Sequence, residues 1–389
     1  MNKATPLDTL EPGFQPWMEP GCFIAPPIPG FGYWKDGRFW DCSQDRLIEA
    51  IRTDKEDSIR LVAVLEQTRL VAPEEVDFLH DAIVARLRLQ ANQGWGMPTA
   101  ALVFCWGLAL LALFQKPDAA LYWLAMGLLA GGGPVFSKVF DRWRANHYPP
   151  VATSDLIAGG RYEAWLGGRT VGVDWVLPIA ISVVGVMQIY VGLEDSVAAA
   201  ALVKAAIWAG EGWRLLTATL LHGSLQHWFS NTVALIVFDT LVARLTDRRV
   251  VPAVFLVAAL TGSVFSLFGT GGTSVGASGG ILGLVGFLGA VLWHRRTVLP
   301  TAAFRPVVES AVFVAVLGAV GYRMIDNWAH LGGALAGLSL GAFYMRLAPP
   351  TLPAPATSRL SPLSWAARAI LMAGTVWALI AMGQAHPLP

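Results

Sequence analysis

The sequence predicts an all-α polytopic membrane protein, and three observations lead to this fold class. Of the 389 residues, 54% are hydrophobic and only 14% are charged, and the mean hydropathy is +0.52. Soluble globular chains are about 45–50% apolar and about 25% charged. Apolar runs recur at the length of roughly 17–25 residues that one helix needs to cross a bilayer. Lysines and arginines concentrate in every second loop between these runs, as the positive-inside rule requires.

The first 92 residues differ in composition from the rest of the chain. After a Pro- and Gly-rich opening, residues 43–89 carry apolar side chains at helical spacing with charged side chains between them. These apolar groups are Leu61, Val64 and Leu65, followed by Val76, Leu79 and Ile83. We therefore expect a small soluble helical domain over 1–92. No apolar stretch of the signal-peptide type opens the sequence, so the first membrane helix is expected to direct insertion.

Nine candidate membrane spans follow this domain. They cover 94–114, 119–137, 171–192, 225–243, 251–268, 276–293, 304–322, 326–346 and 364–383. Six of them lie within 171–346. Two additional helices with a cytoplasmic linker occupy 93–170, and a linker with one C-terminal helix occupies 347–389. Basic loop residues place the N-terminus of this multi-pass protein in the cytoplasm. By elimination, the lack of an organellar presequence favours a bacterial inner membrane.

Charge and cysteine content exclude several classes of partner. The formal net charge is +1, which gives no basic field to attract the phosphates of a nucleic acid. The three cysteines, Cys22, Cys42 and Cys105, contain no CxxC pair, so the sequence predicts neither a disulfide framework nor a zinc site. We therefore expect no nucleic-acid partner.

Three polar segments lie where a bilayer should exclude them. They are 222–231, 269–280 and 327–337, and in the nine-span topology each begins a helix at the outer face of the membrane. Polar and ionisable groups inside a membrane are expensive to bury, so they are functional candidates by default. The preceding outer segment, 193–224, mixes tryptophans with apolar residues and is expected to rest in the membrane interface.

Ser278 is the candidate nucleophile. It lies in the sequence Gly276-Ala277-Ser278-Gly279, a glycine-rich turn that leads into an apolar helix. Free backbone N–H groups at a helix N-terminus suit a developing oxyanion. A serine that merely caps the helix would give the same sequence, because serine is a preferred N-cap residue.

His330 is the candidate general base, which a serine hydroxyl needs before it becomes a good nucleophile. It enters an apolar helix whose glycines lie on roughly its own face, and a matching glycine stripe lies beside Ser278. The stripes are Gly333, Gly337 and Gly341, and Gly279, Gly283 and Gly286. Small residues on facing helices allow close approach, which could bring the imidazole to the hydroxyl. The alternative is a stripe that serves packing alone, with His330 as a cap.

His227 and Asn231 are candidate oxyanion donors. They are four residues apart and therefore share one face of a helix, and both side chains can donate hydrogen bonds. A structural His–Asn hydrogen bond is the alternative interpretation. We assign His222 to holding the segment 193–224 in place.

The pattern of these residues resembles the rhomboid family of intramembrane serine proteases. The residues that carry the resemblance are Trp213-Arg214, His222, His227, Asn231, Gly276-x-Ser278-Gly279, and Ala329-His330-x-Gly332-Gly333 with Gly337. Their order, spacing and shared sidedness are specific as a combination. The resemblance covers roughly Val171 to Arg346, the six-helix core. Many relatives have an aromatic residue four positions after the serine, where this chain has Leu282.

The resemblance implies an intramembrane serine endopeptidase with a Ser278–His330 dyad and no acidic third member. His227, Asn231 and the backbone N–H of Ser278 would form the oxyanion hole. Transmembrane segments of other proteins would enter laterally from the lipid and be cleaved near the outer face, without metal or cofactor. Two other functions are weighed against this one: a catalytically silent rhomboid-like protein that binds membrane helices, and a transporter. A transporter would show an internal repeat with broken helices, which the sequence lacks.

Overall fold

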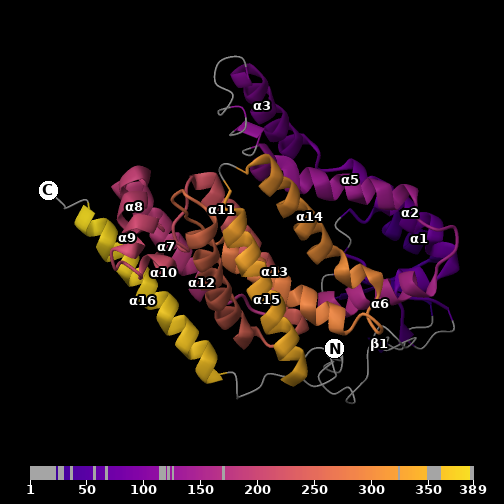
Figure 1. Cartoon of the computed structure of the whole chain (residues 1–389). Helices are drawn as coiled ribbons and strands as arrows, with labels where there is room; N and C mark the ends of the chain where they lie inside the picture. Colours follow the sequence, from indigo (N-terminus) through magenta and orange to yellow (C-terminus); the bar gives the residue numbers. More distant parts are fainter. Residues whose placement is uncertain are drawn as a thin grey trace. The chain divides into compact units, whose positions relative to one another are not determined.

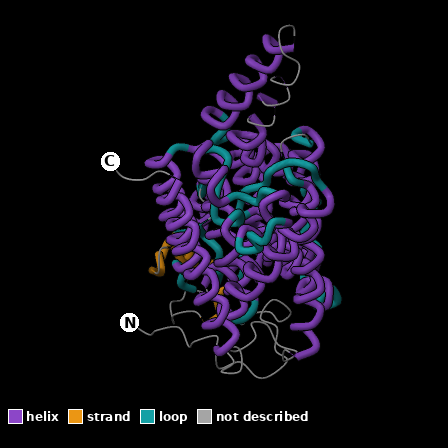
Figure 2. Tube along the Cα trace, turned by 60° about the vertical axis from the view of Figure 1, so that its left-hand side comes forward, coloured by secondary structure: helices purple, strands orange, loops and turns teal. Residues whose placement is uncertain are grey.

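The computed structural model describes residues 23–24, 30–35, 38–55, 58–65, 69–113, 120, 123–124, 127–168, 171–322, 325–347 and 361–385. Most of these residues are helical, as Figure 2 shows. They group into two compact units. The first unit comprises Met1–Val103, Gly131–Thr170 and Arg295–Glu309, and the second comprises Phe104–Ala130, Val171–His294 and Ser310–Pro389. Cys22 and residues 119, 121, 122, 125 and 126 of the candidate span 119–137 lie outside the described residues.

The first unit contains strands, so the expectation of an all-α fold with a helical N-terminal domain is wrong for this part of the chain. Strand β2 (Phe31–Lys35) pairs antiparallel with β3 (Arg38–Cys42) and with β4 (Leu61–Ala63). Strand β1 (Phe23–Ile24) pairs antiparallel with β5 (Arg69–Leu70). The aromatic side chains of β2 and β3 favour a pleated sheet. Leu61, expected on a helix, lies in β4 because pairing with β2 satisfies its backbone, and so short a stretch of helix would be marginal.

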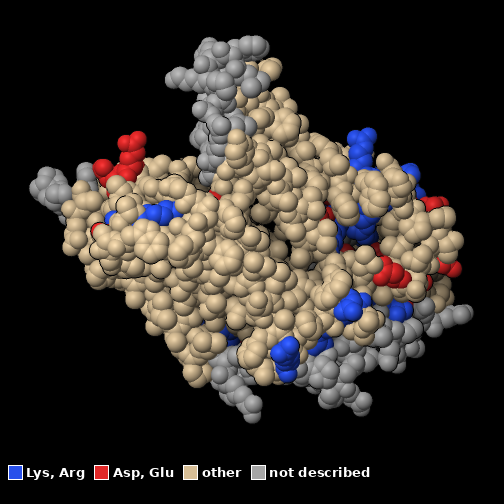
Figure 3. Space-filling view, viewed as in Figure 1, with Lys and Arg blue, Asp and Glu red and all other residues tan. Residues whose placement is uncertain are grey.

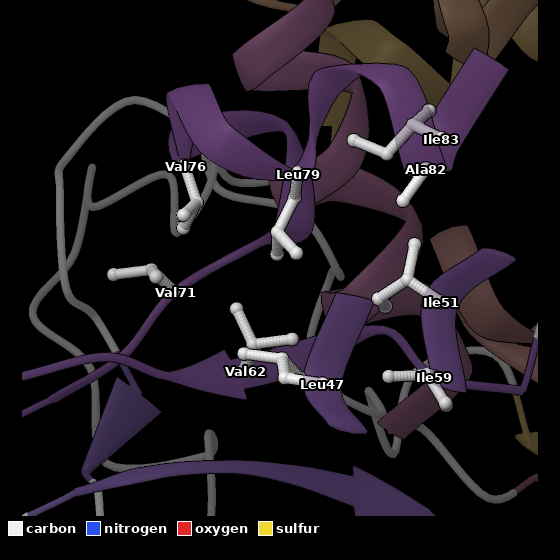
Figure 4. Packing of buried hydrophobic residues seen from close by; sticks show 9 residues of the cluster. All are labelled: Leu47, Ile51, Ile59, Val62, Val71, Val76, Leu79, Ala82 and Ile83. Atoms are coloured by element: carbon white, nitrogen blue, oxygen red, sulfur yellow. The ribbon is translucent and has the colours of Figure 1, made fainter. Parts of the chain in front are cut away.

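Helices complete the first unit around one apolar core. They are α1 (Gln44–Thr53), η2 (Pro73–Glu75), η3 (Asp77–Leu79), α2 (His80–Asn92), α5 (Gly133–Asn146), α6 (Ser154–Gly168) and η6 (Thr301–Phe304). Figure 4 shows buried side chains of the core, to which α1 contributes Leu47 and Ile51. Val76, Leu79 and Ile83 also belong to this core, so the second predicted apolar group is confirmed.

Ion pairs tie distant segments of the first unit together. Arg161 of α6 contacts Glu75 of η2, with Nη2 and Oε2 separated by 2.6 Å, and both side chains are largely buried. Arg60 pairs with Glu163. Charged side chains accordingly gather around α1, α2 and α5 in Figure 3. Because Gly131–Thr170 joins this unit, the domain boundary expected at residue 92 stays a prediction.

The second unit is a bundle of helices. They are α7 (Val176–Val191), α8 (Leu193–Ala200), α9 (Lys204–Trp208), α10 (Arg214–Thr217), α11 (Leu225–Leu245), η5 (Arg248–Val250), α12 (Val251–Gly269), α13 (Ser278–His294), α15 (Asn327–Leu347) and α16 (Ser361–Ala385). Helices α3 (Gly96–Leu113), η4 (Leu128–Gly132, a π-helix) and α14 (Arg305–Val320) contribute residues to both units. In Figure 1, α12, α13 and α15 lie side by side, and α16 packs against α7, α8 and α12.

Among the described residues, five helical segments are long and apolar enough to cross a membrane. They are Asp77–Leu111, Leu225–Leu245, Arg248–Gly269, Thr301–Val320 and Pro362–Ala385. Val176–Val191 and Ser278–His294 are shorter apolar helices. The predicted span 326–346 forms α15, whose polar first turn and many glycines lower its hydropathy. The expected total of nine spans therefore stays a prediction, while a multi-pass arrangement is supported.

Glycines allow the closest helix contact of the second unit, between α13 and α15. A Cβ atom added at Gly333 would lie 2.0 Å from the carbonyl oxygen of Gly279. A Cβ atom at Gly337 would lie 1.9 Å from the carbonyl oxygen of Gly283. No real side chain fits at such distances, so the two backbones touch directly. The close approach predicted from the two glycine stripes is confirmed.

Candidate active site

Ser278 is the first residue of α13, and the loop before it has a fixed backbone course. Gly276 has φ of +133°, a conformation that side chains of L-residues rarely adopt, which explains the glycine there. Its N–H donates to the carbonyl of Ala218 at 2.9 Å. Ser274 and Leu202 form an isolated antiparallel bridge. The segment 193–224 therefore supports the serine loop through backbone hydrogen bonds.

His330 meets Ser278 directly. Its Nε2 atom lies 2.8 Å from Oγ of Ser278, the geometry in which a hydroxyl donates to a neutral imidazole. Both residues are half-buried and so remain accessible. His330 lies in the first turn of α15, where the glycine contacts bring it to the start of α13. Nδ1 of His330 is buried and has no hydrogen-bond partner among the described residues.

His227 and Asn231 lie one turn apart on α11. Ser224 caps this helix by accepting a hydrogen bond from the N–H of His227 at 3.1 Å. Asn231 is only 8% exposed, and its Nδ2 donor finds no hydrogen-bond partner in the part of the chain that the structure describes. A Cβ atom added at Gly276 would lie 2.8 Å from Cε1 of His227 and 3.6 Å from Nδ2 of Asn231. Both side chains thus flank the loop that leads to Ser278.

One cavity of about 470 Å³ contains all four predicted site residues. Its apolar wall includes Phe238, Phe313 and Leu317, and its polar wall includes Ser263, Ser266 and Thr219. A mostly apolar cavity with a few convergent polar groups is typical of a binding or catalytic site. An imidazole paired with a serine hydroxyl can activate it for nucleophilic attack, and an amide donor nearby can stabilise a developing negative charge.

The outer segment is held by buried polar contacts. Arg214 donates from Nη1 to the carbonyls of Ala198 and Ala201, at 3.1 and 3.0 Å. Thr217 donates to the carbonyl of Ala200 at 2.7 Å. The backbone of His222 exchanges two hydrogen bonds with the side chain of Gln188 on α7, at 2.9 and 3.0 Å. Its ring meets that of His227 edge to face, with 5.2 Å between the ring centroids.

A second polar cluster, three of whose residues also line the cavity, was missed by the sequence analysis. It joins Lys204, Ser266, Thr270, Ser274 and Asp326, through contacts from Nζ of Lys204 and to the carboxylate of Asp326. A lysine and an aspartate in otherwise apolar outer segments were the available signal. Only the fold shows that they converge. Within the described residues, no group of three or more His, Cys, Asp or Glu side chains is arranged to hold a metal ion.

Comparison with known proteins matches the part of the chain that forms this cavity. The model of the rhomboid domain matches residues 209–347. "RHOMBOID-like protein 4" of Arabidopsis thaliana is 31% identical over 140 residues, which are 36% of this chain and 36% of the relative. "Rhomboid protease GluP" of Bacillus subtilis is 35% identical over 152 residues, 38% of this chain and 29% of the relative.

A third relative is "RHOMBOID-like protein 6, mitochondrial" of Arabidopsis thaliana, 31% identical over 140 residues, which cover 36% of this chain and 45% of that protein. The matched region thus spans about a third to a half of the length of these curated relatives. No solved structure matches the chain.

Proposed function

This chain is a multi-pass membrane protein of the rhomboid family, and on that premise we propose that it is an intramembrane serine endopeptidase. Its substrates are transmembrane segments of other membrane proteins. Ser278 is the nucleophile and His330 is the general base. The catalytic core lies within 171–346.

The contact between Ser278 and His330 is the observation that carries this proposal. The separation of 2.8 Å between Oγ and Nε2 suits proton transfer from hydroxyl to imidazole. The two residues come from different helices, and the close backbone contact of α13 with α15 supports their alignment. A serine that merely capped α13 would have no need of a histidine at this position.

The proposed reaction has two chemical steps. Oγ of Ser278 attacks the carbonyl carbon of a peptide bond while Nε2 of His330 takes the hydroxyl proton. The imidazolium then gives this proton to the departing amine, which leaves an acyl-enzyme. Water attacks the ester in the second step, with His330 again accepting and then returning a proton to Oγ. Nδ2 of Asn231, the His227 side chain and the N–H of Ser278 stabilise the oxyanion of each tetrahedral intermediate.

The orientation in the membrane completes the proposal. The N-terminus lies in the cytoplasm of a bacterial cell, and the cavity opens toward the outer face of the inner membrane. This orientation rests on the distribution of lysine and arginine among the loops. Cleavage then occurs near the outer surface, where a substrate helix can unwind and water can reach the acyl-enzyme.

The decisive experiment compares the purified wild-type protein with Ser278→Ala and His330→Ala on a fluorescently tagged single-span substrate. We expect cleavage by the wild type and none by either variant, because each lacks one half of the dyad. Ser339→Ala is the matched control, since Ser339 lies on α15 but its hydroxyl only donates to the carbonyl of Leu335. It should cleave at the wild-type rate.

Labelling with a fluorophosphonate adds a readout that needs no substrate. The wild type should be labelled at Ser278, and Ser278→Ala should not. If the wild type neither cleaves a panel of substrates nor takes up the label, the chain instead acts as a rhomboid-like protein that captures membrane helices without cleaving them.

A further inference from the structure

The polar cluster around Asp326 joins four separate parts of the second unit. Lys204 comes from α9, Ser266 from the end of α12, Ser274 from the loop before Ser278, and Asp326 from the residue preceding α15. Ser266 is fully buried, and Lys204, Ser274 and Asp326 are half-buried. Charged groups in such surroundings are costly unless other groups satisfy them. The hydrogen bonds within the cluster therefore offset the cost of burying its charged groups.

Lys204 holds the loop that leads to the serine. Its Nζ donates to Oγ1 of Thr270 at 2.7 Å and to the carbonyl of Gly272. It also reaches Oγ of Ser266 at 3.4 Å and Oγ of Ser274 at 3.5 Å. Burial lowers the pKa of Lys204, and the negative charge of Asp326 opposes that shift. One cation thus fixes the end of α12 and the serine loop together.

Asp326 links this loop to the helix of the histidine. The hydroxyls of Ser266 and Ser274 both donate to its Oδ2. Its Oδ1 accepts the N–H of Ala329 at 2.9 Å, so Asp326 caps α15. The next N–H along, that of His330, donates to the carbonyl of Asp326 at 3.1 Å. The carboxylate is therefore hydrogen-bonded both to the loop that precedes Ser278 and to the first turn of the helix that carries His330.

At the position of His330, a nearby negative charge would stabilise the protonated imidazole. The N-terminal end of a helix carries partial positive charge, which disfavours a cation in the first turn. His330 becomes a cation when it takes the proton of Ser278, and no described residue accepts a hydrogen bond from its Nδ1 to share that charge. The described charged and titratable groups that interact with it are His227 on α11 and Asp326 at the start of its own helix. Only Asp326 offers a compensating charge.

We propose that Asp326 is a positioning residue for the Ser278–His330 pair, fixed by Lys204 through Ser266 and Ser274, and that its charge stabilises the imidazolium of His330. This inference rests on the proposed proteolytic function. Asp326 would then act without touching the substrate or accepting a proton. The negative charge comes from the helix cap and not from a side chain hydrogen-bonded to Nδ1.

The test is the pH dependence of cleavage by Asp326→Asn in the full-length protein. Asparagine caps helices as well as aspartate does, so α15 should keep its start and the protein its thermal stability. We expect kcat to fall about tenfold, the factor equivalent to one pKa unit of lost charge interaction, with KM nearly unchanged. The acidic limb of the pH profile of kcat/KM should move about one unit to lower pH. Without the carboxylate, His330 stays neutral at lower pH than in the wild type.

Three further variants make the outcome decisive. Asp326→Glu restores the charge and should return the acidic limb toward the wild-type position. Lys204→Gln keeps a side-chain donor for the serine loop but removes a positive charge, so it should move the limb in the opposite direction, to higher pH. Asp195→Asn removes an exposed acid of α8 and should change nothing.

The inference would be overturned if Asp326→Asn kept the kcat and the acidic limb of the wild type. It would also be overturned if the limb of Lys204→Gln moved to lower pH. If Asp326→Asn does not fold, Asp326→Glu and Lys204→Gln decide the question, through the limb positions expected for them above. Cleavage by the wild type with an unmoved limb in the variants removes only this inference. No cleavage and no fluorophosphonate labelling of the wild type would remove the proposed function itself.

Discussion

Among the single residues of the cavity, Asn231 carries an amide donor that forms no hydrogen bond within the described residues. Its side chain is almost fully buried, yet its Nδ2 donor has no acceptor. A buried donor without a partner costs about 1–3 kcal/mol, so such groups are rarely kept without a reason. In the proposed reaction, an acceptor that appears only during catalysis, the oxyanion, would offset this cost.

Replacement of Asn231 by alanine should therefore slow cleavage without abolishing it. Loss of one oxyanion donor costs about 2.7–4 kcal/mol in serine proteases, which corresponds to roughly 10²–10³ in kcat. Steady-state kinetics should show this fall with little change in KM, because the bond forms mainly in the transition state. Thr240→Ala on the same helix is the control, since its hydroxyl bonds only within α11. A wild-type kcat in Asn231→Ala would remove this amide from the oxyanion hole.

The sequence allowed some of these residues to be predicted and concealed others. Ser278 and His330 could be named because each is a reactive residue at the polar start of an apolar, glycine-lined helix. The link between Lys204 and Asp326 could not be predicted, because the two residues are far apart in the chain. They are connected through two serines that belong to no recognisable motif. No local pattern encodes such a convergence. The unpaired state of Asn231 likewise depends on what surrounds it in three dimensions.

At the level of elements, the contact between α13 and α15 sets the geometry of the site. Gly337→Ala would bring a Cβ atom within 1.9 Å of the carbonyl oxygen of Gly283, so the helices would have to separate. We expect about 1–3 kcal/mol of destabilisation from this overpacking, together with a large loss of cleavage as His330 moves from Ser278. Thermal unfolding in detergent and a cleavage assay would measure the two effects.

Gly107→Ala is the matched control for this substitution. Gly107 also lies within an apolar helix, α3, but an added Cβ atom would meet nothing within 4 Å. Alanine is the better helix former, so stability should stay equal or rise slightly. If Gly337→Ala proved as harmless as Gly107→Ala, the close contact of α13 with α15 would not be needed for the site.

Helix α1 illustrates a different source of stability, the apolar core of the first unit. Ile51 is fully buried there, beside Leu47 and Ile83. Ile51→Ala should cost about 2–5 kcal/mol, since it removes buried methylene groups and leaves a cavity. Hydrogen exchange of the full-length protein should become faster in α1 and α2. Glu49→Ala on the exposed face of α1 is the control and should leave the exchange rates nearly unchanged.

The strands of this unit show why element type was harder to predict here than in the membrane. Membrane helices are long, and every backbone group inside a bilayer must be satisfied within the helix, so length and hydropathy suffice. In the first unit, three apolar residues at Leu61–Ala63 fit either a short helix or a strand. Pairing with β2 decides between them, and that pairing depends on residues from a separate part of the chain.

On the scale of the whole molecule, the orientation of α13 in the membrane ties the proposed function to one face. Its 17 residues extend about 25 Å at 1.5 Å per residue, close to the ~30 Å of the hydrocarbon core. The loops at its two ends should therefore lie on opposite sides. Thr273 precedes the helix and Thr297 follows it, and both are exposed.

Single cysteines at these two positions test the predicted orientation. In a background with Cys22, Cys42 and Cys105 replaced by serine, a membrane-impermeant maleimide added to intact cells should label Thr273→Cys and spare Thr297→Cys. Permeabilised cells should be labelled at both positions, which shows that Thr297→Cys is reactive. The reverse pattern in intact cells would place the cavity at the cytoplasmic face and move the site of cleavage there. Labelling of both would mean that α13 does not cross the membrane.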